Sequence, residues 1–377
     1  MAAKPPGIAG YPDAAMQTGV APPDAAPAPW VASPPRYTVP ASGGTPLVVS
    51  FVDVVKRFGK EVVLHGLNFS VPPGQVLGII GPSGSGKSTT VRLMLGMYRP
   101  SSGSVTLFGQ DPSRLKRVDR ERVGYMPQDF VLYPTLTAEE TLRFAASLYG
   151  VPWKQAARRS RELLQFVDLT EAHNRRAGDL SGGMRRRLSL AATLMHDPDF
   201  LVLDEPTAGI DPILRVTIWD GLKQARDSGK TLVVTTQYIT EAEYCDNVLL
   251  VYEGMIIAAG TPDQLRHTAT GGDMLDVRLR QAIEPEVAAR LRQLPFVVAV
   301  KGRQRPDELR VTVHSLTNDL PLLAAFFDLE AGGQAEMEPY VPSFEDIFVR
   351  LVNHARAAQE GTSDGHASTN SATHITL

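Results

Sequence analysis

The sequence has few of the features that mark secreted, membrane-spanning or disulfide-bonded proteins. Its single cysteine, Cys245, excludes a disulfide within the chain and suits a reducing compartment. Cys245 lies among apolar residues at helical spacing, so we expect a packed core thiol. No run approaches the roughly 20 consecutive apolar residues that cross a bilayer. Pro and Ala alternate near the N-terminus, where a signal peptide would need a continuous apolar stretch. We therefore expect no membrane span and no signal peptide.

The charge balance is also unremarkable. A net charge of −3 over 377 residues provides no basic footprint, so nucleic acid is not an expected partner. The length and the 43% hydrophobic content suit a soluble globular protein of two or perhaps three domains. No internal repeat is evident, which predicts one copy of the central domain.

Composition divides the chain into four parts. Residues 1–45 are rich in Pro and Ala, and residues 355–377 are rich in Ser, Thr, His and Gly, so both are expected to be disordered tails. Residues 46–268 have an α/β pattern. Residues 270–354 read as β-α-β-β-α-β, which predicts a small C-terminal α+β domain, ferredoxin-like in topology. Its last helix is expected to begin after Ser343, with Asp346 three residues on.

In the central domain, the β-like runs 47–58 and 62–71 are separated by Gly-Lys-Glu and predict an antiparallel pair. The apolar runs 75–80, 201–206 and 231–237 are typical of strands buried on both faces of a parallel sheet. Helical patterns at 140–150 and 153–167 interrupt these strands. The expected architecture is α/β, with an antiparallel layer and a helical subdomain.

A glycine-rich stretch between a strand and a helix predicts a phosphate site. GPSGSGKST fits the pattern GxxxxGK[ST], whose glycines let several N–H groups converge on phosphate oxygens at a helix N-terminus. Lys87 would place its charge at the β- and γ-phosphates, and Ser88 would offer a hydroxyl to Mg²⁺. The expected nucleotide-binding residues here are Gly81, Pro82, Ser83, Gly84, Ser85, Gly86, Lys87, Ser88 and Thr89.

Two carboxylates follow the strand in LVLDEP. Asp204 ends a buried run, where an isolated charge is costly unless a cation such as Mg²⁺ compensates it. Glu205 comes next and could orient or deprotonate a water that attacks the γ-phosphate. An acidic turn in solvent is the plainer reading of an Asp-Glu pair alone, but a phosphate loop upstream disfavours it.

A second anion site is indicated by LSGGMRRR. Ser181, Gly182 and Gly183 open an amphipathic helix, where free N–H groups and a hydroxyl face a positive helix end. Because the chain already has one phosphate site, we expect this second one to serve the nucleotide of another subunit.

Together these motifs resemble the ATP-binding subunit of an ABC transporter over residues 47–265. GPSGSGKST resembles its Walker A motif, LSGGM its signature motif, LVLDE its Walker B motif, AGID ending at Asp211 its D-loop, and YMPQ ending at Gln128 its Q-loop. Phe58 stands where the family stacks an aromatic ring on adenine. The resemblance implies a P-loop NTPase of ABC type that uses ATP and Mg²⁺, with Ser88, Gln128 and Asp204 at the metal.

The resemblance also implies partners. Two such domains, expected to be a homodimer, would face each other head to tail, with Ser181 and Gly183 of one closing on the ATP of the other. A separate integral-membrane permease would dock on the helical subdomain near residues 129–141, which places the protein peripherally at the cytoplasmic face of the membrane. The sequence segments around the signature motif and Gln237, together with the extra C-terminal domain, resemble those of drug or lipid exporters of the daunorubicin-resistance type. A polysaccharide or lipid-linked exporter, and a non-transport ABC ATPase, remain the alternatives.

One position departs from the common family pattern. Gln237 stands after the strand 231–236, where most members have a histidine that contacts the γ-phosphate. A neutral amide can still donate to a phosphate oxygen, although it cannot become cationic. We expect Gln237 to act as the γ-phosphate sensor and Glu205 to be the general base, and Lys87 is the third residue expected to be catalytic. The alternative is that Gln237 only caps the acidic helix that follows.

Overall fold

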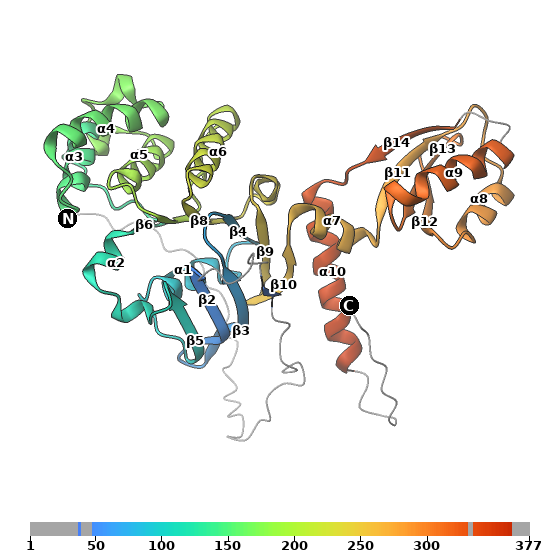
Figure 1. Ribbon diagram of the computed structural model, residues 1–377, viewed down its shortest axis with the longest axis horizontal. Coiled ribbons are helices and arrows are strands. Elements are labelled where there is room, and N and C mark those ends of the chain that lie inside the picture. Colours follow the sequence, from blue (N-terminus) through green and yellow to red (C-terminus); the bar gives the residue numbers. More distant parts are fainter. Residues whose placement is uncertain (1–36, 39–46, 331–334, 364–377) are drawn as a thin grey trace, which may run out of the picture.

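The computed structural model describes residues 37–38, 47–330 and 335–363 (Figure 1). Most of the two expected tails therefore lies outside the described residues. Two parts of those tails do form secondary structure. The strand β1 (Tyr37–Thr38) pairs with β3, and the last helix, α10 (Phe344–Ser363), continues well beyond residue 354.

A six-stranded sheet forms the centre of the larger part of the molecule, in the order β10-β9-β4-β8-β7-β6. All neighbours pair in parallel except β10 with β9, which is an antiparallel hairpin at the edge. Every residue of β4, β7 and β8 is buried, as strands covered on both faces require. The strands are β4 (Val76–Ile80), β6 (Val123–Met126), β7 (Phe200–Asp204), β8 (Thr231–Thr236), β9 (Asn247–Tyr252) and β10 (Met255–Gly260).

Two further layers flank this sheet. A sheet in the order β1-β3-β2-β5 contains the expected antiparallel pair β2 (Val49–Phe58) and β3 (Glu61–Val71), with β5 (Ser102–Leu107) on the far side of β2. The helical subdomain holds α3 (Ala138–Leu148), α4 (Trp153–Phe166) and α5 (Gly182–Leu194). Thr137 and Glu140 form a capping box that begins α3. The remaining helices of the larger part of the molecule are α1 (Lys87–Met94), η1 (Pro112–Arg114), α2 (Arg117–Glu121), η2 (Thr170–Ala172), η3 (Ala177–Asp179), α6 (Pro212–Asp227) and η4 (Ile239–Tyr244).

The C-terminal part has the element order β-α-β-β-α-β. Its sheet runs β12-β13-β11-β14 with every pair antiparallel, and the apolar sides of α8 and α9 pack on one face of it. The α/β core and the small C-terminal α+β unit confirm the expected fold class. The elements are β11 (Asp273–Arg278), α8 (Pro285–Arg292), β12 (Val297–Gly302), β13 (Glu308–Val313), α9 (Leu316–Glu330) and β14 (Glu336–Tyr340).

Two helices connect the parts differently from the boundaries we expected. The boundary at 268–270 falls inside α7 (Pro262–Thr270), which packs against β10. The last helix, α10, leaves the C-terminal sheet and lies beside α7, η4 and β10 (Figure 1). Its residues Phe344, Ile347 and Leu351 join the apolar core of the larger part. As expected, Ser343 caps this helix, because its hydroxyl accepts a hydrogen bond from the Asp346 N–H at 3.2 Å.

Candidate functional site

A cleft of about 240 Å³ opens at the carboxyl ends of the parallel strands, the usual place for ligands in open α/β sheets. Eight of the residues that we predicted for nucleotide binding, metal binding or catalysis line it, together with Val63 of β3, which we did not predict. The predicted residues in the lining are Ser83, Gly84, Gly86, Lys87, Ser88, Thr89, Gln128 and Glu205.

The loop between β4 and α1 needs its glycines for two different reasons. A Cβ at Gly81 would lie 2.0 Å from the carbonyl oxygen of Val251, so a side chain there would collide with backbone. Gly86 has a φ of +100°, a left-handed conformation that favours glycine, and it is the residue from which α1 begins. These two positions let the loop wrap tightly at the helix N-terminus, where N–H groups face an anion.

Lys87 is held inside this loop. Its Nζ donates hydrogen bonds to the carbonyl oxygens of Gly81, at 2.8 Å, and Pro82, at 2.9 Å. Burial lowers the pKa of Lys87, while the negative charges of Glu205 and Asp204 oppose that shift. The ammonium is thus desolvated and near two carboxylates. A phosphate group could compete for it by replacing the two carbonyl partners.

Asp204, at the end of β7, is fully buried, and only one of its two carboxylate oxygens accepts a hydrogen bond from the described residues. Its Oδ1 accepts a hydrogen bond from the Thr235 hydroxyl, whereas Oδ2 has no hydrogen-bond partner in the described part of the chain. A buried carboxylate oxygen without a partner is costly. Asp204 does not line the cleft, but its free oxygen, the Ser88 hydroxyl and the Gln128 amide oxygen, the last two in the cleft lining, are all hard oxygen ligands of the kind that Mg²⁺ prefers. The residues present therefore fit a Mg²⁺ ion.

Glu205 adopts an unusual backbone conformation, with a φ of +53°. Such a value is uncommon for a residue with a side chain, and strain of this kind clusters at functional sites. The Glu205 N–H is held by the carbonyl oxygen of Thr235 at 3.0 Å and by its hydroxyl at 3.1 Å. The side chain turns into the cleft, where the Gln128 Nε2 donates to Oε2 at 3.4 Å.

Arg186 holds the Gln128 segment in place, and sequence reasoning missed it. It is buried in α5, and its guanidinium donates to the Gln128 carbonyl oxygen at 2.6 Å. Burial lowers the pKa of Arg186, opposed by the charges of Glu205, Asp204 and Asp129. The available signal was a run of three arginines on a helix with a buried face.

The motif residues of the second anion site do not line the cleft. The Ser181 hydroxyl caps α5 by accepting from the Met184 N–H at 3.2 Å, and the Asp211 carboxylate caps α6 by accepting from the Leu214 N–H at 3.0 Å. A Cβ at Gly183 would lie 2.9 Å from the Gly209 carbonyl oxygen, so these two loops adjoin each other.

Besides Asp204 and the residues of the second anion site, four other predicted nucleotide-binding residues do not line the cleft. Phe58 is partly exposed at the end of β2, edge-on to the Tyr98 ring at 5.3 Å between centroids. In the phosphate loop, Pro82 is exposed, Gly81 is buried, and Ser85 is buried with a hydroxyl that has no hydrogen-bond partner among the described residues.

Gln237 follows the buried strand β8 and is exposed. Its side chain makes no hydrogen bond within the residues that the structure describes, and it does not line the cleft. The helix that we expected next is the short 3-10 element η4, whose N-cap is Tyr238 without a side-chain cap. The alternative reading, an amide that caps this element, is therefore not what the structure shows.

The fold and this cleft define a P-loop nucleotide-binding protein. Comparison with known proteins makes the class narrower, because a family model described as ABC transporter matches residues 64–208. The chain is 36% identical to the Nod factor export ATP-binding protein I of Cupriavidus metallidurans over 305 residues, covering 81% of this chain and 97% of that protein. It is 34% identical to the linearmycin resistance ATP-binding protein LnrL of Bacillus subtilis over 274 residues, covering 72% of this chain and 84% of LnrL.

Two further similarities bear on size and assembly. Identity to the probable multidrug ABC transporter ATP-binding protein YbhF of Escherichia coli is 38% over 241 residues, 63% of this chain but only 42% of YbhF. Among solved structures, the dimeric post-hydrolysis state of the ATP-binding cassette MJ0796 bound to ADP and Pi has a TM-score of 0.53 and 27% identity, covering 56% of this chain and 98% of that one.

The chain belongs to the ATP-binding proteins of ABC transporters and carries their ABC ATPase domain. This confirms the resemblance drawn from the motifs. None of the helices described is both long enough and apolar enough to cross a bilayer.

Proposed function

We propose that this chain is the ATP-binding and ATP-hydrolysing subunit of an ABC exporter that moves a drug-like or lipid substrate. The observation that carries the proposal is a desolvated lysine, Lys87, and a strained glutamate, Glu205, in the lining of one cleft, with the buried carboxylate of Asp204, which has one oxygen without a hydrogen-bond partner among the described residues, directly before that glutamate. The printed names of the relatives, which concern multidrug transport, linearmycin resistance and Nod factor export, support the direction of transport.

In this proposal, Lys87 and the N–H groups of residues 81–89 bind the β- and γ-phosphates. Ser88, Gln128 and the free oxygen of Asp204 would hold Mg²⁺, which neutralises phosphate charge when bound. Glu205 orients the attacking water and accepts its proton. Gln237, exposed beyond β8, donates its amide to the γ-phosphate once the nucleotide is in place.

The proposal includes a second ATP-binding subunit, most simply a second copy of this chain. Ser181, Gly183 and Asp211 lie outside the cleft, although the motifs that contain them belong to an ATP site. A head-to-tail partner resolves this, since its signature loop would close over the nucleotide. The dimeric arrangement named for the MJ0796 cassette supports this assembly.

A membrane permease is the other proposed partner. After Gln128 the chain exposes Phe130, Val131 and Tyr133, which are 41%, 77% and 56% accessible. Exposed apolar side chains grouped in this way are typical of an interaction surface. We place the protein at the cytoplasmic face of the membrane through this contact.

The test combines turnover with location. The purified chain should release phosphate from Mg·ATP, and a tagged chain should sediment with membranes only in cells that make the cognate permease. An alkaline carbonate wash should release it, because the contact is peripheral. Sedimentation with ribosomes instead of membranes would contradict the exporter and favour a non-transport ABC ATPase.

A further inference from the structure

Arg215 and Glu241 form an ion pair in which the carboxylate is buried and the guanidinium is partly exposed, and none of the roles above uses it. Arg215 lies in the first turns of α6, and Glu241 lies in η4. The Glu241 side chain is 1% exposed, and the distance from its Oε1 to the Arg215 Nε is 3.6 Å. A carboxylate so deeply buried requires a compensating partner, and Arg215 is the cation that supplies it.

The pair is only partly satisfied by hydrogen bonds. The Thr207 hydroxyl donates to the Glu241 Oε1 at 2.6 Å, whereas the Glu241 Oε2 and the Arg215 Nε have no hydrogen-bond partner in the described part of the chain. A partly buried pair of this kind is weak support for stability by itself. Its position beside the proposed catalytic groups offers a different reason for it.

Arg215 reaches two separate loops. Its NH2 donates to the carbonyl oxygen of Ile210 at 3.3 Å, one residue before Asp211. Its guanidinium also stacks 4.1 Å from the ring centre of Tyr238, one residue after Gln237. A planar guanidinium suits this double task, since it can stack on a ring and donate from its edge at once.

Glu241 contacts the same two segments, the loop after Glu205 and the turn that contains Gln237. Its N–H donates to the Tyr238 carbonyl oxygen at 3.1 Å, and its carboxylate holds Thr207, two residues after Glu205. Between these anchors, the Ala208 N–H donates to the Glu205 carbonyl oxygen at 3.3 Å. The loop after Glu205 and the turn containing Gln237 are therefore joined through one ion pair.

We propose that Arg215 and Glu241 are positioning residues for ATP hydrolysis, which hold the loop 205–211 and the turn 236–238 in one fixed relation. This inference rests on the proposed function. Neither residue lines the cleft, so they act through Glu205 and Gln237. Their loss should affect turnover more than ATP affinity, because the phosphate loop stays intact.

The test uses the full chain with Arg215→Met, Glu241→Gln and the double variant. Turnover is divided by the number of nucleotide-binding sites measured in the same sample, which removes any effect of misfolded protein. Turnover per site should fall roughly 10- to 100-fold in Arg215→Met, since small misplacements near a reacting centre have costs of this size. KM for ATP should stay within about twofold of the wild-type value. Turnover per site should remain low in the double variant, although Glu241→Gln removes the unpaired buried charge.

Arg310→Met is the matched control, because Arg310 also forms a partly buried ion pair, with Asp276 in the C-terminal sheet. It should leave turnover per site unchanged. If Arg215→Met has wild-type turnover per site, the inference is wrong while the proposed function stands. If the wild-type chain has no turnover that Lys87→Ala abolishes, the proposed function fails, and the inference fails with it.

Discussion

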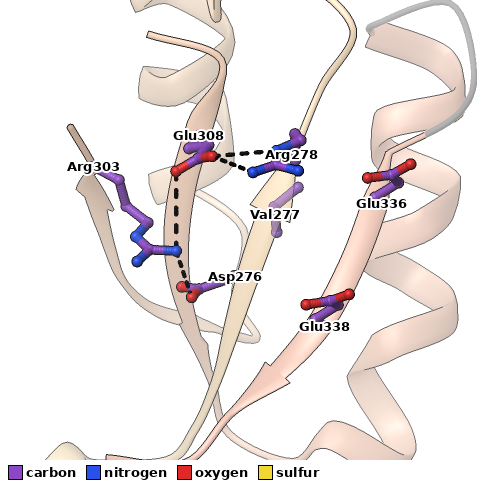
Figure 2. A pocket seen from close by; sticks show the side chains of 7 residues that line it. All are labelled: Asp276, Val277, Arg278, Arg303, Glu308, Glu336 and Glu338. Atoms are coloured by element: carbon purple, nitrogen blue, oxygen red, sulfur yellow. Dashed lines mark hydrogen bonds and ion pairs between the residues drawn. The ribbon is translucent and has the colours of Figure 1, made fainter. Parts of the chain in front are cut away.

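Two sheets in this molecule carry clustered charged side chains. The charges are paired within the cluster on one sheet, and on the other a buried oxygen is left without a partner among the described residues. At the carboxyl edge of the central sheet, Lys87, Asp204 and Glu205 are all buried, and Asp204 retains an oxygen without a partner among the described residues. On the outer face of the C-terminal sheet, Asp276 and Glu308 are neutralised by neighbouring arginines (Figure 2).

The C-terminal cluster is complete without a ligand. Asp276 accepts from Arg310 at 2.8 and 3.0 Å and from Arg303 at 2.6 Å, and Glu308 pairs with Arg278 at 2.6 Å. Glu336 and Glu338 stand along the neighbouring strand without contacts to this network in Figure 2, and both are exposed to water. The comparison teaches that charge density alone does not mark a site. Buried groups with unused hydrogen-bonding capacity do.

The largest expected effect comes from removing the buried cation. Lys87→Ala should lower ATP turnover by about 10²-fold or more, because it deletes the charge that we propose to act on the transferred phosphate. Phosphate release from Mg·ATP measures this directly. Wild-type turnover in Lys87→Ala would mean that the cleft is not the site.

Glu205→Gln separates binding from chemistry. The amide keeps the size of the side chain but is not a base, so hydrolysis should fall by about 10²–10⁴-fold. ATP affinity should be retained. A single-turnover assay with bound ATP measures the loss, and normal hydrolysis in this variant would remove Glu205 from the role of general base.

Gln237 should have a smaller effect that depends on pH. Gln237→Ala should reduce turnover, since the donor that we propose for the γ-phosphate is lost. Gln237→His should add a change in rate near the ordinary histidine pKa of about 6.5 that the wild type lacks. The measurement is turnover from about pH 5.5 to 8.5. An Ala variant with unchanged rate would show that this position does not meet the phosphate.

The smallest effect is expected in the C-terminal cluster. The hydrogen bonds from Arg310, and then its positive charge, lower the pKa of Asp276, so the folded state favours the charged carboxylate. That stabilisation is present at neutral pH and is lost as pH falls from the unfolded pKa of 3.8 through the lower folded value.

Asp276→Asn should therefore destabilise the C-terminal sheet by about 1 kcal/mol or less at pH 7. The difference from wild type should shrink only as pH falls below 3.8, where the wild-type carboxylate begins to be protonated in the unfolded and then in the folded chain. Hydrogen exchange in β11 and β13 measures this local stability, and ATP turnover at pH 7 should not change. A large loss of turnover would show that this cluster belongs to the catalytic machinery.

Local patterns in the sequence predicted most of the fold and much of the cleft. The phosphate loop is recognisable because its glycines, Lys87 and Ser88 lie within nine consecutive positions. The C-terminal strands and helices were also predictable, since each has its own apolar period. The helix α1 after the phosphate loop ends at Met94, and Gly96, with a φ of +69°, follows this end.

What the sequence did not reveal depends on contacts between distant residues. Arg186 donates a hydrogen bond to the carbonyl oxygen of Gln128, 58 positions earlier in the chain, and Thr207 donates one to Glu241, 34 positions later. The packing of α10 against the central core is another long-range contact of this kind. The apolar pattern of Phe344 and Ile347 predicts a buried helix face but not the element against which that face packs. The positive φ of Glu205 could not be predicted from the sequence either, because the surrounding structure imposes this backbone strain.

Hydrogen exchange on the Glu205→Gln chain, with and without saturating Mg·ATP, tests the contrast between the two sheets most directly. We predict slower exchange in residues 81–90 and 204–211, where unused hydrogen-bonding capacity meets the nucleotide, and no change in residues 273–278 and 308–313. Protection of the C-terminal strands with an unchanged phosphate loop would contradict this account.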